Sequence, residues 1–550
     1  MTAGLAPTPP TDTVAPRPLI QLDPPGPRWV KVLDQTKCIG CHACTTACKS
    51  ENEVPIGVTR TYVKAVDVGT FPQVRRNFQV TRCNQCSDAP CVAACPTSAM
   101  FRRPDGIVDF NKSSCIGCKA CIAACPYDAI FINPEDHTAE KCNFCAQRLD
   151  VGLEPACVVV CPTQAIMVGD VNDPLSLVSS IVQREPVAVR RPEKETRPGL
   201  FYKGATQATL DPLAARRPAG GTFMWSEQIE GDHIVNSGYP GGAERALAGT
   251  SRGGWNSSAA AVLAYDIPHS VPWDWRVSLY TWTKGIAAGA YLVPLLLVLA
   301  GVVAVDNPLW TWFAPVAGGA FLGLTGLLLI WDLEQPERFL YIFLRPQWRS
   351  WLVRGAVFIS GFAALLAAHF GVAVALAAGV ALPSDLTRTL ALAGAPFAFL
   401  TAVYTAWLFA QSTARDLWQS PLLAPHLIVQ AVLAGSAATL LAAVVLAPAA
   451  VATLSLWLAA AAAVHLAFVA AEVTLPHPTA HAHLATHQMT RGRFAEFFWG
   501  GVLLVAAAAG GALAAPVLGP LVVGAPLAAL LGLMAHEHGF VQAGQSVPLA

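Results

Sequence analysis

Cysteines are the residues of this chain whose type and spacing most clearly indicate chemistry. All 16 lie before residue 162, in four groups of four. The groups are Cys38, Cys41, Cys44 and Cys48; Cys83, Cys86, Cys91 and Cys95; Cys115, Cys118, Cys121 and Cys125; and Cys142, Cys145, Cys157 and Cys161. Thiols so closely spaced can bind metal, form disulfides or remain free and buried.

The spacing favours iron–sulfur clusters over these alternatives. No secretion signal opens the sequence, so a reducing compartment is expected, where disulfides are rare. Structural zinc prefers two well-separated CxxC pairs, whereas CxxCxxCxxxC, as in the stretch from Cys38, puts three thiols in one tight loop and the fourth apart. In bacterial ferredoxins such a loop binds one cluster, and its fourth cysteine, commonly followed by proline, binds the next. Proline follows the last cysteine of three groups, at Pro96, Pro126 and Pro162. Four 4Fe–4S clusters are therefore expected.

The fourth group, in KCNFCAQRLDVGLEPACVVVCPTQAI from Lys141, has a longer internal gap. This segment resembles the four-cluster electron-transfer subunit of molybdopterin oxidoreductases of the dimethyl sulfoxide and polysulfide reductase type. The resemblance implies an α+β ferredoxin-like domain over residues 30–205, in which paired groups exchange their last cysteines. The implied ligand sets are Cys38, Cys41, Cys44 and Cys161; Cys142, Cys145, Cys157 and Cys48; Cys83, Cys86, Cys91 and Cys125; and Cys115, Cys118, Cys121 and Cys95.

The rest of the sequence divides by composition. Residues 1–29 are rich in proline and predict a disordered or wrapping arm, and residues 206–270, rich in proline, glycine and arginine, predict an extended linker. Residues 271–550 contain repeated apolar windows long enough to cross a bilayer. Eight spans are expected, at 278–304, 309–331, 351–377, 388–411, 425–447, 451–472, 496–515 and 517–537. The second half is thus predicted to be an all-α, eight-helix transmembrane bundle.

Basic residues in the short loops predict the orientation of this bundle. Loops on the iron–sulfur side contain Arg338, Arg345, Arg349, Arg415, Arg491 and Arg493, whereas the opposite loops offer Arg388. Because positive loops stay inside, the iron–sulfur domain is expected on the cytoplasmic side of a bacterial-type cytoplasmic membrane.

DLEQPERF, from Asp332 to Phe339, follows the second expected span. With AQSTARDLWQSPLLAPHL from Ala410, it resembles the polysulfide-reductase-type (NrfD-like) membrane anchor. That family implies a haem-free bundle of eight helices that exchanges electrons between an iron–sulfur subunit and a quinone. Here the two subunits are expected to be fused in one polypeptide.

A quinone site needs donors for two carbonyl oxygens and a partner for proton exchange, within an apolar slot. Ionisable groups at membrane depth are functional candidates by default. The residues predicted to form this site are His269, Lys284, Asp332 and Tyr404.

Other polar residues of the second half leave alternatives open. His465 and Glu472 could relay protons along the sixth span, and HEH at 536–538 is expected at the interface. Haem b, bound by pairs of His369, His426 and His465, is the alternative cofactor, but eight spans and DLEQPERF favour an anchor without haem.

The expected function is that of the electron-transfer and quinone-interacting subunit of a respiratory oxidoreductase. Electrons would pass between membrane quinone or quinol and a separate molybdopterin (molybdenum or tungsten) catalytic subunit. The sequence shows no pterin site of its own, and its net charge of +0 argues against nucleic acid as a partner. The alternatives are a quinone-linked module fed by a multihaem cytochrome or hydrogenase, and a redox-driven ion pump.

Overall fold

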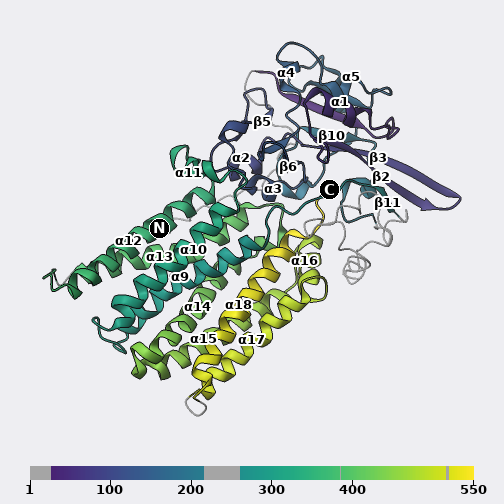
Figure 1. The fold of residues 1–550 in the computed structure, drawn as a ribbon. Coiled ribbons are helices and arrows are strands. Elements are labelled where there is room, and N and C mark those ends of the chain that lie inside the picture. The colour runs from purple at the N-terminus through teal and green to yellow at the C-terminus, as the bar shows by residue number, and fades with distance from the viewer. Residues whose placement is uncertain (1–25, 216–260, 384–385, 516–518) are drawn as a thin grey trace, which may run out of the picture.

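The computed structural model describes residues 26–215, 261–383, 386–515 and 519–550. It has two parts: a smaller α+β part built around the cysteines, and a bundle of long helices whose one end carries it (Figure 1). The predicted fold class is confirmed. Most of the expected arm (1–29) and most of the expected linker (206–270) lie outside the described residues.

Two sheets frame the α+β part. The first has the order β8-β1-β10-β9, and the second the order β11-β2-β3. Their strands are β1 (Trp29–Asp34), β8 (Ile166–Asp170), β9 (Val187–Ala188), β10 (Leu200–Lys203), β2 (Thr61–Thr70), β3 (Gln73–Arg82) and β11 (Val262–Tyr265). Two hairpins, β4 (Met100–Arg102) with β5 (Val108–Phe110) and β6 (Ile130–Ile132) with β7 (Ala139–Lys141), complete it.

Short helices in this part contain cysteines or, in the case of α4, directly follow one. They are α1 (Ala43–Glu51), α2 (Pro90–Ala94), α3 (Ala120–Ala124), α4 (Ala146–Leu149) and α5 (Ala156–Val159), with α6 (Leu177–Arg184) and α7 (Gln207–Leu210) further on. The loops before α1 and α3 turn through left-handed residues, among them Gly40 at φ 69° and Gly117 at φ 68°. Glycine adopts this conformation at low cost, which explains the CIGC sequence in both loops.

The bundle contains, among the described residues, 8 helices long and apolar enough to cross a membrane. They are α9 (Trp275–Leu299), α10 (Ala314–Trp331, preceded by the π-helical turn Leu309–Phe313), α12 (Trp351–Ala377), α13 (Leu386–Gln411), α14 (Leu423–Leu446), α15 (Val451–Thr474), α17 (Ala495–Ala514) and α18 (Leu521–Gln545). The shorter helices α11 (Tyr341–Leu344) and α16 (Ala480–Thr490) join them at the iron–sulfur end.

Several helix boundaries differ from the sequence prediction, and the largest differences are in α9, which ends at Leu299 and not at 304, and in α18. Helix α9 starts at Trp275 because the Asp274 side chain accepts a hydrogen bond from the backbone N–H of Arg276. Helix α18 continues to Gln545, well past the expected end at 537. Its last turns are polar in sequence but pack inside the protein, so hydropathy alone ends the helix too early.

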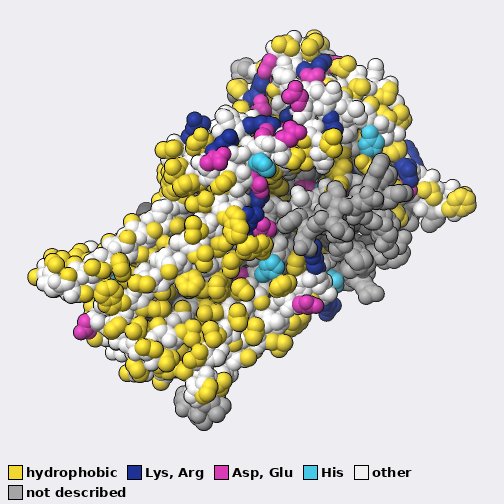
Figure 2. Space-filling model, in the orientation of Figure 1, with side chains coloured by type: hydrophobic (Ala, Val, Ile, Leu, Met, Phe, Trp, Pro, Cys, Tyr) yellow, Lys and Arg dark blue, Asp and Glu magenta, His cyan; other side chains and the backbone are white. Residues whose placement is uncertain are grey.

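The surface of the bundle is that of a multi-pass membrane protein. Large apolar side chains such as Leu299, Leu327, Trp331 and Leu503 are exposed around it, and Figure 2 shows apolar atoms covering the bundle while charged side chains gather on the iron–sulfur part. Helix α9 lies inside, with 72% of its most apolar stretch buried, against 22% for α12. Polar groups on α9 therefore face protein, not lipid.

Strand β11 lies within residues 206–270, the range predicted to be an extended linker, but it forms part of a sheet. It pairs antiparallel with β2, joining Leu263 to Val66. The segment leading into the first membrane helix is thus fixed to the iron–sulfur part by a sheet.

Candidate functional site

Two of the predicted ligand sets each surround a cavity. Cys38, Cys41, Cys44 and Cys161 line one of about 320 Å³, and Cys95, Cys115, Cys118 and Cys121 line another of about 360 Å³. Each set combines three thiols of one group with the last thiol of another. Four thiols around one shared space fit a cubane cluster.

The other two sets are brought together in the same way. Cys48 interacts electrostatically with Cys142, Cys145 and Cys157. Cys86 does so with Cys83, Cys91 and Cys125. Burial, followed by these neighbouring thiols, raises the pKa of Cys48 to about 12 and raises that of Cys86. Such crowding is unfavourable for thiolates alone and indicates sites that need a cation or cluster to neutralise them.

Thiols of different sets lie close enough to interact electrostatically, and these pairs place the sets one after another in a line. Cys121 interacts with Cys91, Cys83 with Cys142, and Cys44 with Cys157. The order therefore runs from the set with Cys118, through the sets with Cys86 and Cys145, to the set with Cys41. The Cys41 side chain at the outer end is exposed.

Buried cations lie beside the middle of this line. Arg82 donates from Nη1 to Sγ of Cys157 over 3.0 Å, and Nζ of Lys31 lies 3.9 Å from the same sulfur. Burial raises the pKa of Cys157, but Arg82 and Lys31 outweigh it and lower that pKa to about 7. Positive charge at this point suits an anionic thiolate-bound cluster.

The inner end of the line touches the membrane bundle through DLEQPERF. The backbone N–H of Glu334 donates to the carbonyl of Gly117 (3.3 Å), and the indole N–H of Trp273 donates to the carbonyl of Cys118 (3.2 Å). Arg338 donates to the carbonyls of Lys112 and Cys115. The loop after α10 therefore covers the third cysteine group directly.

A buried polar cluster lies within the bundle, on α9, α13 and α18. Nζ of Lys284 donates to the carbonyl of Ala402 (2.8 Å) and to Oγ1 of Thr405 (2.7 Å), and lies 5.1 Å from the ring centre of Tyr404. Glu537 is close enough to interact electrostatically with Lys284. Lys284 is 1% exposed, so it does not extend to the interface.

The structure thus brings Lys284 and Tyr404 together but gives His269 and Asp332 other partners. His269 bonds Asp128 and Asp266 between the two parts of the protein. Burial lowers the pKa of His269, but the two carboxylates outweigh it and raise that pKa to about 9. Asp332 pairs with Lys119; burial nevertheless raises its pKa to about 6.

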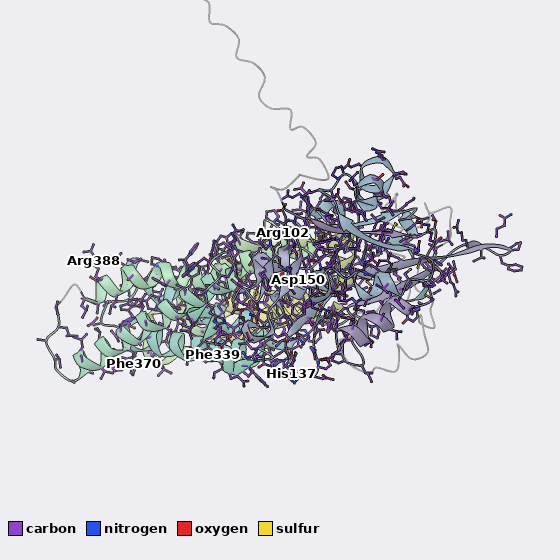
Figure 3. All side chains as sticks on the ribbon, turned by 90° about the horizontal axis from the view of Figure 1, so that it is seen from above. Arg102, His137, Asp150, Phe339, Phe370 and Arg388 are labelled. Carbon is purple, nitrogen blue, oxygen red and sulfur yellow. The ribbon has the colours of Figure 1, made fainter. Side chains whose placement is uncertain are left out.

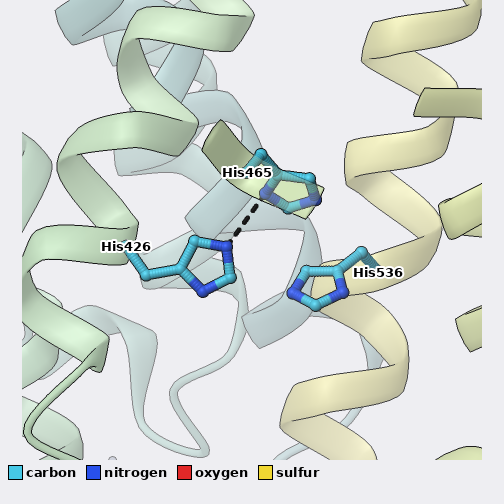
Figure 4. Close-up of side chains that lie close together, drawn as sticks. All are labelled: His426, His465 and His536. Carbon is cyan, nitrogen blue, oxygen red and sulfur yellow. Dashed lines mark hydrogen bonds between the residues drawn. The ribbon is translucent and has the colours of Figure 1, made fainter. Parts of the chain in front are cut away.

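Sequence reasoning missed a second polar cluster in the bundle. His426, His465 and His536, on α14, α15 and α18, meet there (Figure 4). His536 and Glu537, from the HEH stretch expected at the interface, are 2% and 6% exposed and lie buried between helices. A histidine on each of three apolar helices was the available signal, but sequence does not show which helix faces meet.

Comparison with known proteins matches both parts. The 4Fe-4S dicluster domain family matches residues 74–171, and the family described as polysulphide reductase, NrfD matches residues 266–548. The protein NrfC of Escherichia coli is 44% identical over 179 residues, which make up 32% of this chain and 80% of that protein. The thiosulfate reductase electron transfer subunit PhsB of Salmonella typhi is 46% identical over 149 residues, covering 26% and 78%. The arsenate respiratory reductase iron-sulfur subunit ArrB of a Shewanella species is 36% identical over 219 residues, covering 31% and 94%.

Proposed function

The protein belongs to the NrfD polysulphide reductase family and carries a 4Fe-4S dicluster domain in the same polypeptide, and from that premise we propose that it transfers electrons between membrane quinone and a separate molybdopterin catalytic subunit. Four 4Fe–4S clusters, held by the four cysteine sets, form the path. The protein supplies spacing and electrostatics while the cofactors carry the redox chemistry.

The observation that carries this proposal is the line of cysteine sets with one end at the bundle and the other at the surface. At the outer end, Cys41 is exposed, and the apolar side chains Ile39 and Val159 nearby are 57% and 62% exposed. An exposed apolar rim around a redox site suits a partner protein. We assign this end to the catalytic subunit.

At the inner end, the Lys284 cluster is the proposed quinone site. The ammonium of Lys284 has three hydrogens, and Ala402 and Thr405 accept two of them. The third can hydrogen-bond a quinone oxygen, and the Tyr404 hydroxyl is a second donor within the same apolar surroundings. His269 and Asp332, predicted for the same site, are proposed instead to hold the iron–sulfur part against the bundle.

The iron–sulfur part is proposed to face the cytoplasm. Arg388 lies at the far end of the bundle from that part (Figure 3). Arg338, Arg345 and Arg415, counted as positive loop residues, donate to Cys115, Ser114 and Gln545. These arginines therefore have a structural role besides their effect on topology. A fluorescent protein fused after Ala550 should fluoresce in cells, and a phosphatase fused in the 300–308 loop should be active; the reverse pattern would place the clusters outside.

The decisive experiment is gentle purification of the tagged protein from its native membranes, with identification of bound polypeptides and of molybdenum or tungsten. A large pterin-containing partner supports the proposal. If a multihaem cytochrome or a hydrogenase copurifies instead, and neither molybdenum nor tungsten is found, the molybdopterin partner is rejected. The proposed electron path to quinone would still stand. Cluster reduction by added quinol, followed by electron paramagnetic resonance, tests the path separately.

A further inference from the structure

The three histidines of the second polar cluster present their ring nitrogens to one another. Nε2 of His426 and Nδ1 of His465 are 2.9 Å apart, and one nitrogen from each of His426, His465 and His536 lies within 4.8 Å of the others. The three side chains are 1%, 1% and 2% exposed. They come from three different helices, so the meeting is a product of helix packing (Figure 4).

Glu472 fixes how His426 faces this meeting point. Its Oε1 lies 2.9 Å from Nδ1 of His426. A carboxylate can only accept here, so Nδ1 carries the proton and the lone pair of Nε2 points towards the other two rings. A carboxylate behind a histidine in this way is the usual support of a metal-binding imidazole.

Two polar atoms of the cluster have no hydrogen-bond partner within the part of the chain that the structure describes: Nδ1 of His536 and Oε2 of Glu472. An unpaired buried polar atom is unfavourable, because it has lost its hydrogen bonds to water without gaining others. A bound cation would give the third imidazole a partner, and the negative charge of Glu472 would offset its charge.

We propose that His426, His465 and His536 bind a late first-row transition metal ion, such as zinc, with Glu472 orienting His426. Imidazole nitrogens suit these ions, which bind them at about 2.0 to 2.1 Å. Tetrahedral binding needs nitrogens about 3.3 Å apart, which requires His426 and His465 to separate slightly and His536 to approach. His465 then carries its proton on Nε2. The ion links α14, α15 and α18 and is separate from the iron–sulfur path.

The test uses the full-length protein with its clusters intact. After incubation with zinc and removal of the excess, metal content is compared between the natural protein and the His465→Gln/His536→Gln double variant. We expect the double variant to bind one zinc ion fewer per protein molecule than the natural protein. X-ray absorption spectra at the zinc edge should show nitrogen ligands at about 2.0 Å and no sulfur ligands at about 2.3 Å. This result distinguishes the histidine site from zinc bound by the cysteines.

Of two controls, one matches the double variant in position and the other in burial. His538→Gln alters the same helix as His536, but His538 packs against Phe497. His369→Gln removes a buried histidine that lies against Trp310. Both should keep the zinc. If the double variant does not fold, the zinc ligands seen in the spectrum of the natural protein, nitrogen or sulfur, test the proposal on their own.

Three outcomes would overturn the site: equal zinc in the natural protein and double variant, sulfur ligands in the spectrum, or zinc loss in His538→Gln as well. If zinc is equal because neither protein takes any up, slower quinol oxidation by the His426→Gln variant would identify a proton relay in place of the metal site.

Discussion

Nζ of Lys119 lies 3.3 Å from Oδ1 of Asp332, with only 9% and 8% of the two side chains exposed. This ion pair joins the third cysteine loop to the end of the second membrane helix. Glu334 adds a second carboxylate 3.1 Å from the same ammonium. A buried pair is costly to break, because the remaining partner is left without compensation. The contact therefore fixes how the inner cysteine set meets the bundle.

Gly117 is the first place to test this contact. A Cβ there would lie 2.5 Å from Cβ of Glu334 and 2.9 Å from its backbone nitrogen. Gly117→Ala should therefore displace the loop and slow cluster reduction by quinol. Gly57→Ala is the matched control, since Gly57 also has a positive φ, 91°, but no atom within 4 Å of the added Cβ. The control should lower stability by about 1 to 2 kcal/mol, because Ala is strained at a positive φ, and leave the rate of cluster reduction unchanged. Equal rates in both variants would show that the contact does not limit transfer.

The exchange of cysteines between groups can be tested by counting iron. Cys95→Ala and Cys118→Ala should each remove the same cluster, so the double variant should lose only about four iron atoms per protein molecule. Cys95→Ala with Cys86→Ala should lose about eight, because these two cysteines share a group in sequence but not a proposed cluster. The opposite result would assign each cluster to one uninterrupted group.

Lys284 should be important for the reaction with quinol. Lys284→Met removes a charged donor, and charged hydrogen bonds contribute about 1.5 to 3 kcal/mol, so kcat/KM for quinol should fall roughly 10- to 100-fold. Tyr404→Phe should have a smaller effect in the same direction. Ser436→Ala, on α14 and 0% exposed, is the control and should leave kcat/KM unchanged. Iron content should be unaffected in all three, and an unchanged kcat/KM in Lys284→Met would place the quinone elsewhere.

The attachment of residues 262–269 to the iron–sulfur part should depend on pH through His269. Its pKa is raised from 6.5 to about 9 by Asp266 and Asp128 against the effect of burial. Because the folded-state pKa is the higher one, the stabilisation is complete below pH 6.5 and is lost as pH rises through about 9. Its size is on the order of 3 kcal/mol.

Protection of this segment from protease should accordingly fall between about pH 7 and pH 10 in the natural protein. His269→Gln should be more susceptible at about pH 7 and change little over that range. Protection that does not vary with pH in the natural protein would contradict the assigned charge state.

Sequence alone determined the iron–sulfur character, the membrane half and the approximate position of every span. Cysteine spacing is local along the sequence, and apolar windows must be long to cross a bilayer, so both signals survive without tertiary structure. Sequence also selected Lys284 and Tyr404, since polar groups at membrane depth are rare.

Tertiary structure decided what depends on which helix faces meet. It gave His269 and Asp332 partners at the junction, brought strand β11 into a sheet, and grouped three histidines from α14, α15 and α18. These bundle helices are nearly uniformly apolar, so periodicity does not show which side of each helix faces the protein. Only the packing of the helices against one another, with α18 far from α14 in sequence, places those side chains together.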